Sequence, residues 1–342
     1  MTRSTSFFIL GLALGMVAAG GCFAWLGQNS KDSSLAGGRV LKVAHSLPTS
    51  HPVHHGLEFM AQRVDELSNG TLTLKVFPNE QLGSETECLE KVQTGTLDIT
   101  KTSSAPIGNF VPIYQVFSLP YLFRDEAHFW ATLDGEIGRE MLERISTQAD
   151  GQATGLQGLG YFDSGSRSFY AGKPILTPSD LKGMKVRVMN DQVAMDMVQA
   201  MGGSPTPIAY GELYTALKQG TVDGAENNPP SFVTSRHYEI AKHYSLDHHA
   251  RIPDVIVMSM DVWNTLSAEQ QGWIKQAVEE ASEFQRTEWQ KETDKCLAQL
   301  KEAGVNIVEP KSELFRQATE SVRQKYATGE IGTMVERITK LP

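Results

Sequence analysis

Two arginines and one asparagine in the middle of the chain carry the side chains needed to grip a carboxylate. Arg167 lies in the strand-like stretch SRSFY, and Arg187 lies in KVRVM between two valines. Because successive side chains of a strand point to opposite faces, Val186 and Val188 should enter a core while Arg187 faces away from it. Asn227 follows the strand-like stretch VDGAE, shortly before a double proline at which the chain must turn.

The chemistry that these three side chains offer is anion binding. An arginine holds a carboxylate through two parallel hydrogen bonds, which fix its orientation as well as its charge. In open α/β sheets, ligands bind beyond the carboxyl ends of the strands. The pattern therefore predicts a carboxylate clamp of Arg167, Arg187 and Asn227. The alternative is that both arginines form ordinary ion pairs at the surface or between domains, and the pattern alone leaves both interpretations open.

The elements that must position these residues alternate between strands and helices. Strand-like patterns lie at 40–45, 71–77, 97–100, 153–162, 185–189, 222–226 and 254–260, and helix-like patterns at 54–68, 191–201, 210–218 and 267–303. This alternation predicts α/β layers with mostly parallel sheets. The nearly continuous apolar run at 254–260 is typical of a buried central strand. Ser84 and Glu87 form a capping box, and 267–303 predicts a helix about 55 Å long, enough to cross two domains.

Length, charge and cysteine content narrow the class of protein. The 342 residues carry 31 Lys and Arg against 40 Asp and Glu, a formal net charge of −9. The length suits two domains or one large α/β domain, and the acidic balance argues against a nucleic-acid binder. Cys22, Cys88 and Cys296 are too few for a disulfide scaffold. Cys88 and Cys296 could pair in an oxidising compartment, although two buried free thiols are the simpler expectation.

The chain lacks the common motifs of enzymes and of metal or nucleotide sites. It has no Walker A loop, no His-Glu-x-x-His and no Gly-x-Ser-x-Gly, and its glycine cluster at 155–160 follows no clear strand and opens no helix. His51 precedes a proline and should lie outside the following helix, so we expect His51, His54 and His55 to face solvent or ligand rather than a metal. We predict no catalytic residues, no cofactor and no metal.

The first residues read as an export signal. No charged residue occurs from residue 7 to 27, and Arg3 precedes this stretch. The stretch is also long enough to span a bilayer, and three small residues before Cys22 resemble a lipoprotein processing site. Residues 1–27 are thus predicted to be a cleaved signal peptide, a lipoprotein anchor or a membrane anchor, followed by a linker at 28–38. Each alternative places the rest of the chain outside the cytoplasm, in the periplasm.

Several motifs follow one another along the chain. They are P-x-D-L-K-G-x-K-x-R-V at 178–188, G-x-S-P-T-P at 202–207, E-x-Y-x-A-L at 212–217 and V-D-G-x-E-N at 222–227. Further stretches are LKVAHSLPTSHPVHHGLEF near residue 41, FPNEQLGSE near residue 77 and FSLPYLFRDEAHFW at 117–130. In this order the motifs resemble the solute-binding proteins of TRAP (tripartite ATP-independent periplasmic) transporters, and the resemblance covers nearly the whole mature chain.

The resemblance implies a fold and a role. Arg187 would form the ion pair with the ligand carboxylate, and Arg167 and Asn227 would complete the clamp. The fold implied is α/β, a two-lobed periplasmic binding protein with a ligand cleft between the lobes and a long helix crossing both. The divisions are 39–164 with about 253–292 for lobe I, 165–252 with about 293–325 for lobe II, and 326–342 as a C-terminal segment. The protein, expected to be a monomer, would deliver its ligand to TRAP membrane permease subunits.

Other polar side chains in the cleft must bind the part of the ligand that lies away from its carboxylate. Candidates by position are Ser46 and His54 near the first strand, Glu85 after a turn, Lys101 and Ser103 after the strand-like LDIT, and Tyr210 before Glu212. Glu85 could instead favour a helix N-terminus through the helix dipole, Tyr210 could be core, and Lys101 could be a solvated strand end. Together, Glu85, Lys101 and Ser103 suit a ligand with several hydroxyls, whose donors and acceptors must be paired on burial.

The ligand class follows from a narrower resemblance. The segments TKTSSAP, GSRSFY, SPTPIAYGELY and AENNPPSF are similar to the family branch that binds hexuronates, which implies a sugar acid such as glucuronate or galacturonate. The alternatives are another organic acid, of the C4-dicarboxylate or sialic acid type, and a membrane-anchored sensor subunit with the same fold. An enzyme on this scaffold is not expected, because no nucleophile–base pair lies in the motif region.

Overall fold

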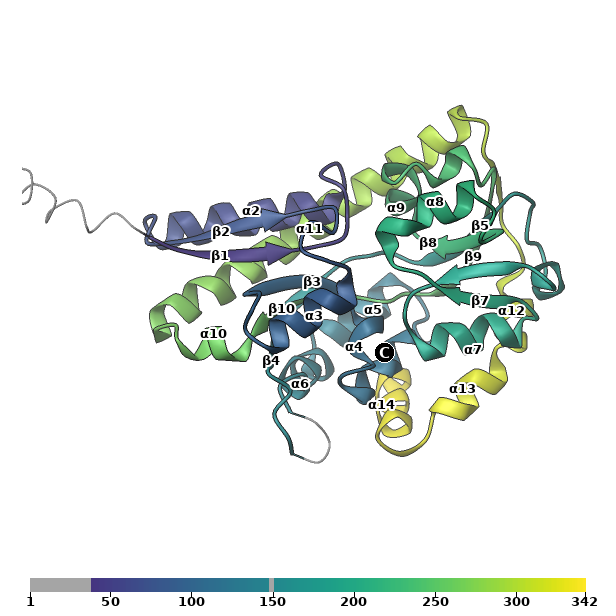
Figure 1. The fold of residues 1–342 in the computed structure, drawn as a ribbon. Helices are drawn as coiled ribbons and strands as arrows, with labels where there is room; N and C mark the ends of the chain where they lie inside the picture. The colour runs from purple at the N-terminus through teal and green to yellow at the C-terminus, as the bar shows by residue number, and fades with distance from the viewer. Residues whose placement is uncertain (1–37, 148–150) are drawn as a thin grey trace, which may run out of the picture.

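The computed structural model describes residues 38–147 and 151–342, and its strands form two separate sheets (Figure 1). The first sheet has the strand order β2-β1-β3-β10-β4, and the second has the order β11-β9-β5-β8-β6-β7. The strands are β1 Arg39–Ala44, β2 Leu72–Phe77, β3 Ile99–Ser103, β4 Leu156–Phe162, β5 Arg167–Ala171, β6 Lys185–Val188, β7 Ser204–Pro207, β8 Gly224–Asn227, β9 His243–Ala250, β10 Asp254–Ser259 and β11 Asn306–Val308.

Helices of very different length cover these sheets. The α-helices are α2 Pro52–Leu67, α3 Glu85–Gln93, α4 Ser104–Ile107, α5 Glu126–Leu133, α6 Glu136–Arg144, α7 Gln192–Ala200, α8 Leu213–Lys218, α9 Pro229–Thr234, α10 Met260–Asn264, α11 Ala268–Glu302, α12 Ser312–Ala318, α13 Glu320–Tyr326 and α14 Gly329–Lys340. The short 3-10 helices are η2 Pro112–Ser118, η3 Pro178–Leu181, η4 Tyr210–Glu212 and η5 His237–Glu239.

The prediction of mostly parallel sheets is confirmed, although both sheets are mixed: five of the nine strand pairs in the described ranges are parallel. Strand β10 runs antiparallel to β3 and β4, and β5 runs antiparallel to β8 and β9. The parallel pairs, such as β1 with β2 and β6 with β7, have a helix between their strands. The chain enters β5 and β10 directly from the other sheet, through 163–166 and 251–253, and these two strands run against their neighbours.

These two short segments carry the chain between the sheets. Phe162, at the end of β4, pairs with Asp254 at the start of β10, and Arg167, at the start of β5, pairs with Ala250 at the end of β9. The two crossing segments therefore lie next to each other. One joins β4 to β5, and the other joins β9 to β10, the strands that pair with them. Arg167 and Asp254 are each the first residue after a crossing, which places both charged side chains at the junction of the sheets.

The long helix predicted at 267–303 is confirmed as α11, which has 35 residues. The Ser267 side chain accepts a hydrogen bond from the backbone of Gln270, and the Gln270 side chain returns one to Ser267. The helix contacts α2 and β4 beside the first sheet and α9 and β11 beside the second. In Figure 1 it runs diagonally from beside the first sheet to beside the second, so one helix packs against both.

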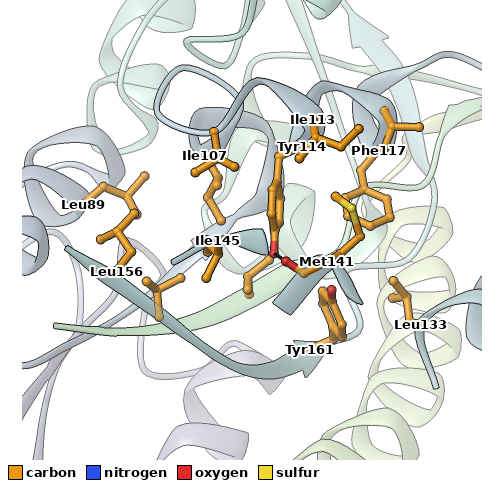
Figure 2. Close-up of a cluster of buried hydrophobic side chains, with 14 of the residues drawn as sticks. Leu89, Ile107, Ile113, Tyr114, Phe117, Leu133, Met141, Ile145, Leu156 and Tyr161 are labelled. Atoms are coloured by element: carbon orange, nitrogen blue, oxygen red, sulfur yellow. Dashed lines mark hydrogen bonds between the residues drawn. The ribbon is translucent and has the colours of Figure 1, made fainter. Parts of the chain in front are cut away.

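Apolar clusters cover both faces of the first sheet. Figure 2 shows one of them, in which Tyr114 and Phe117 are fully buried beside Met141. The Tyr114 hydroxyl donates to the backbone oxygen of Met141 at 2.7 Å, and the Tyr161 hydroxyl donates to Gly138 at 2.9 Å. Because both buried hydroxyls have partners, they cost the core little. A second cluster fills the space between the sheet, α2 and α11.

Most local predictions are confirmed, with shifted boundaries. Ser84 and Glu87 form the predicted capping box of α3, and His51 is the N-cap of α2, outside the helix. The strand predicted at 97–100 lies at Ile99–Ser103, so that Lys101 and Ser103 are inside β3 rather than after it. The helix predicted at 210–218 begins with the 3-10 turn η4 before α8.

The predictions about the cysteines, a membrane anchor and the lobe boundaries have different outcomes. Cys88 and Cys296 are buried and free, as the simpler expectation had it. Within the described residues, no helix combines the length and apolar character that crossing a membrane requires. The predicted export signal or anchor and Cys22 lie outside the described residues. The lobe boundaries, with 326–342 as a separate segment, stay predictions.

Two glycines on packed helices test the contact between α2 and α11. A Cβ at Gly56 would lie 2.8 Å from the Phe162 ring and 2.9 Å from the Gln285 side chain, whereas a Cβ at Gly272 would meet nothing within 4 Å. We expect Gly56→Ala to lower the free energy of unfolding by about 1–3 kcal/mol through overpacking. Gly272→Ala should raise it by roughly 0.5–1 kcal/mol through helix propensity. Urea unfolding measures both, and a Gly56→Ala protein as stable as the parent would contradict the close approach.

Candidate ligand-binding site

A pocket between the two sheets brings together eight of the nine side chains predicted to contact ligand. They are Ser46, Glu85, Lys101, Ser103, Arg167, Arg187, Tyr210 and Asn227. Ser46, Glu85, Lys101 and Ser103, together with Asp254, come from elements of the first sheet and are called the first wall. Arg167, Arg187, Tyr210 and Asn227 come from elements of the second sheet and are called the second wall. The ninth predicted residue, His54, does not line this pocket.

Arg187 on the second wall is a buried cation without an acidic partner in hydrogen-bond contact. Only 3% of its surface is exposed, and its Nε donates to the backbone oxygen of Ile208 at 2.9 Å. Its Nη1 is buried and has no hydrogen-bond partner among the described residues. Burial lowers the pKa of Arg187, even though the Glu226 carboxylate nearby acts in the opposite direction. A buried donor without a partner is costly, so this guanidinium is poised to accept an anion.

The guanidinium of Arg167, unlike that of Arg187, has acidic and amide partners within the protein. Its Nε lies 2.5 Å from Oε2 of Glu226 and its Nη2 lies 2.9 Å from Oε1, so the two side chains form a two-pronged ion pair. Its Nη1 donates to Oδ1 of Asn227 at 3.1 Å. Arg167 therefore does combine with Asn227, but most of its hydrogen-bonding capacity is spent inside the protein. Four of the five donors of Arg167 are thus used, whereas Arg187 has an Nη1 without any partner among the described residues.

A chain of buried charges continues behind Arg167. His249 is fully buried, with Nδ1 2.9 Å from Asp247 and Nε2 3.4 Å from Glu226. Burial alone would lower the pKa of His249, but Asp247 and Glu226 raise it to about 9. Burial alone would raise the pKa of Glu226, but Arg167 and His249 lower it to about 2. At neutral pH the four side chains thus alternate in charge and sum to zero, which fixes Glu226 and, through it, Arg167.

The first wall is organised around Lys101. Its ammonium lies 3.2 Å from Oε1 of Glu85 and 3.2 Å from Oδ2 of Asp254. Glu85 Oε1 also accepts from the Ser103 backbone at 3.2 Å and from the Ser46 hydroxyl at 3.4 Å. Lys101 is therefore not a solvated strand end, and Glu85 does more than begin a helix. The wall carries two carboxylates and one ammonium.

The charges of the first wall differ in how firmly they are held. Burial alone would lower the pKa of Lys101, but Asp254 and Glu85 raise it, so that Lys101 is charged at neutral pH. Burial raises the pKa of Asp254 to about 6, although Lys101 acts in the opposite direction. Asp254 is thus ionised at neutral pH at some cost, because its one ammonium neighbour is shared with Glu85.

Tyr210 closes one side of the second wall. Its hydroxyl lies 2.7 Å from the Ser235 hydroxyl and donates to the Ser231 backbone at 3.3 Å. The Arg187 guanidinium carbon lies 5.8 Å from the centre of the Tyr210 ring, which limits the directions that the guanidinium can take. Tyr210 thus combines the two roles foreseen for it, since it lines the pocket and also packs against the apolar cluster of the first sheet.

His51 and His54, both near the start of α2, face different surroundings, which the sequence did not reveal. His51 lines the pocket, and its Nε2 lies 3.1 Å from the Ser231 hydroxyl on the opposite side. His54 turns away, with Nδ1 3.0 Å from Nε2 of His45 and Nε2 3.8 Å from Glu58. His51 therefore occupies the place predicted for His54.

The prediction missed Asp254, Glu226 and His51. Asp254 opens the apolar run DVIVMSM, and a charge at the start of a fully buried strand was the available signal. Glu226 immediately precedes Asn227, but its pairing with Arg167 depends on the register of β5 against β8. No group of three or more His, Cys, Asp or Glu side chains in the described ranges is placed to hold a metal ion. The pocket thus offers charged and polar groups suited to holding a polar anion.

Known proteins of similar sequence and structure identify this architecture. Residues 43–329 match the family described as bacterial extracellular solute-binding protein, family 7. The Salmonella typhimurium protein YiiZ is 38% identical over 288 residues, which cover 84% of this chain and 86% of that protein.

Solved structures agree with the sequence match. A TRAP periplasmic solute-binding protein from Bradyrhizobium sp. BTAi1, in complex with D-galacturonate, is 40% identical with a TM-score of 0.84, covering 89% of this chain and 100% of that one. One from Pseudomonas putida F1, with bound D-glucuronate, is 37% identical with a TM-score of 0.85, covering 88% and 97%. The predicted two-lobed fold is confirmed, and the chain belongs to the TRAP transporter solute-binding proteins of family 7.

Proposed function

We propose that this protein captures a hexuronate, such as glucuronate or galacturonate, outside the cytoplasm and delivers it to a TRAP membrane permease. The observation that carries the proposal is the buried guanidinium of Arg187, whose Nη1 has no partner among the described residues although it lies at the pocket. A carboxylate placed there would accept its hydrogen bonds and neutralise its charge. Binding is thus expected to remove a cost that the empty site carries.

Arg167 and Asn227 are proposed to support the same carboxylate. Arg167 is held by Glu226 and directs Nη1 toward Asn227 at 3.1 Å. Because the Oδ1 of Asn227 is already engaged, its amide nitrogen is the atom that we propose donates to an anion at the pocket. In this arrangement Arg187 supplies the unpaired charge, while Arg167 and Asn227 supply fixed geometry.

The first wall is proposed to hold the hydroxyl groups of the sugar. Lys101 and Ser103 offer donors, and Glu85 and Asp254 offer acceptors, all facing the same pocket. The pocket is lined mainly by polar and charged side chains from both walls, as a site that orients one small polar ligand requires. The galacturonate- and glucuronate-bound relatives support this ligand class, and a relative from Polaromonas sp. JS666 bound to D-erythronate shows that the fold also accepts a shorter hydroxy acid.

The partners and location follow from the family rather than from the described residues. We propose export through residues 1–27, with Cys22 lipidated if the segment is a lipoprotein signal, and a periplasmic location. A monomer that docks on permease subunits fits the family's role in transport. The runner-up is the same protein serving another organic acid, because the C4-dicarboxylate-binding protein of Rhodobacter capsulatus is 29% identical over 266 residues.

Ligand binding is tested first on ligand-free protein. We expect glucuronate or galacturonate to raise the melting temperature in scanning fluorimetry, because a ligand that binds only the folded state stabilises it. Glucose and galactose, which lack the carboxylate, should cause no shift at the same concentration. The absence of a shift with every sugar acid would contradict the proposal.

The geometry of the clamp is tested at Arg187. Arg187→Lys replaces the planar guanidinium with a single amino group, which cannot form two parallel hydrogen bonds. We expect it to weaken uronate binding by about 2–5 kcal/mol, the usual effect of breaking a buried charge pair. Calorimetry measures the affinity. The matched control is Arg236→Lys, because Arg236 is an exposed arginine on the same side of the molecule as the second sheet. Near-parental affinity of Arg187→Lys would exclude the two-pronged contact.

The buried charges behind Arg167 predict a pH dependence of stability. The His249 pKa is raised to about 9 from 6.5. Its stabilising effect is therefore complete below pH 6.5 and is lost as the pH rises toward 9, by on the order of 3 kcal/mol. Urea unfolding between pH 7 and 9 measures the loss, and His55→Gln should leave it unchanged. An NMR titration in which every imidazole loses its proton below pH 7.5 would contradict the charged network.

A further inference from the structure

The two walls of the pocket differ in net charge. On the first wall, Glu85 and Asp254 share the single ammonium of Lys101, which gives −1. On the second wall, Arg167 is balanced by Glu226, and Arg187 has no acidic partner, which gives +1. Asp247 and His249 behind it cancel each other. The pocket thus has a positive and a negative side for one ligand.

The hydrogen-bond inventory of the first wall sharpens this contrast. Oε1 of Glu85 already accepts from Ser46, Lys101 and Ser103, and Oδ2 of Asp254 accepts from Lys101. Oε2 of Glu85 and Oδ1 of Asp254 accept from none of the described residues. Two of the three ammonium hydrogens of Lys101 are used, which leaves one donor. The wall therefore offers more free acceptors than donors.

Hydroxyl groups and carboxylates respond to such a wall in opposite ways. A hydroxyl can donate to a free carboxylate oxygen and accept from the remaining Lys101 hydrogen. A second carboxylate on the ligand has no hydrogen to donate, and it would lie beside two like charges that share a single counter-ion. Like-charge contact inside a partly desolvated site opposes binding strongly.

We propose that Glu85, Lys101 and Asp254 act as a charge filter, which accepts sugar acids with a hydroxyl group at the end away from the carboxylate and rejects diacids of the same length. The inference rests on the proposed function, because it assumes that the ligand's first carboxylate is at Arg187. It assigns to Asp254 a role in specificity. It also explains why a wall that binds a small anion carries two acids.

Two ligands separate the filter from ligand shape. Galactonate and galactarate are both open-chain six-carbon acids, and they differ only in a CH₂OH group against a second carboxylate. We expect the parent protein to bind galactarate at least about 30-fold more weakly than galactonate in calorimetry at pH 7.5. Equal affinity for the two acids would overturn the filter, whereas failure to bind galacturonate and galactonate at all would overturn the proposed function instead.

Substitutions then locate the effect. Glu85→Gln and Asp254→Asn each remove one charge, keep the shape of the side chain and leave Lys101 an acidic partner. Each is expected to reduce the galactonate-to-galactarate ratio by about 5-fold or more. Glu80→Gln is the matched control, because Glu80 lies near Glu85 without lining the pocket and accepts from the Gly211 backbone at 3.0 Å. A galactonate-to-galactarate ratio that is unchanged in both variants, or reduced equally by Glu80→Gln, would refute the filter. If a variant does not fold, the ratio measured on the parent protein decides.

Discussion

The need to pair every buried charge at the junction of the two sheets governs this structure. An unpaired ion taken out of water is costly, and removing one partner of a buried pair is more damaging than never having built it. Arg167, Glu226, His249 and Asp247 meet this need with alternating charges. Lys101 meets it with two carboxylates. Among the pocket cations in the described ranges, Arg187 is left with backbone and ring contacts alone, and this imbalance makes the pocket a receptor for an anion.

The topology explains how these charges come to the same place. The chain passes between the sheets through 163–166 and 251–253, and the first residues after the crossings are Arg167 and Asp254. Each belongs to a strand whose partners are antiparallel, so its neighbours at the junction are the carboxyl ends of the adjacent strands. The site thus lies where the fold is most constrained by pairing and where the two halves of the chain meet.

The sequence predicted elements and residue types better than partners. The long helix, the capping box at Ser84 and the pocket position of Arg187 follow from local patterns, which depend on spacing along one element. The mostly parallel sheets were predicted correctly, but the reversal of β5 and β10 was not, because alternating strands and helices do not reveal a direct crossing between sheets. The pairing of Arg167 with Glu226 depends on the register between β5 and β8, and the contact of His51 with Ser231 depends on the relative placement of α2 and α9. Such relations arise between elements and leave no local trace.

The choice of arginine at position 187 follows from the same constraint on charge. Burial without an acidic hydrogen-bond partner lowers the pKa of this group below its usual value. A guanidinium begins so far above neutrality that it stays protonated, whereas a buried lysine in such surroundings commonly releases its proton and with it the charge that binds an anion. Lys101 can be a lysine because Asp254 and Glu85 hold its proton. The two cations therefore differ for one reason: one must remain charged without a partner until a ligand arrives, and the other is never without one.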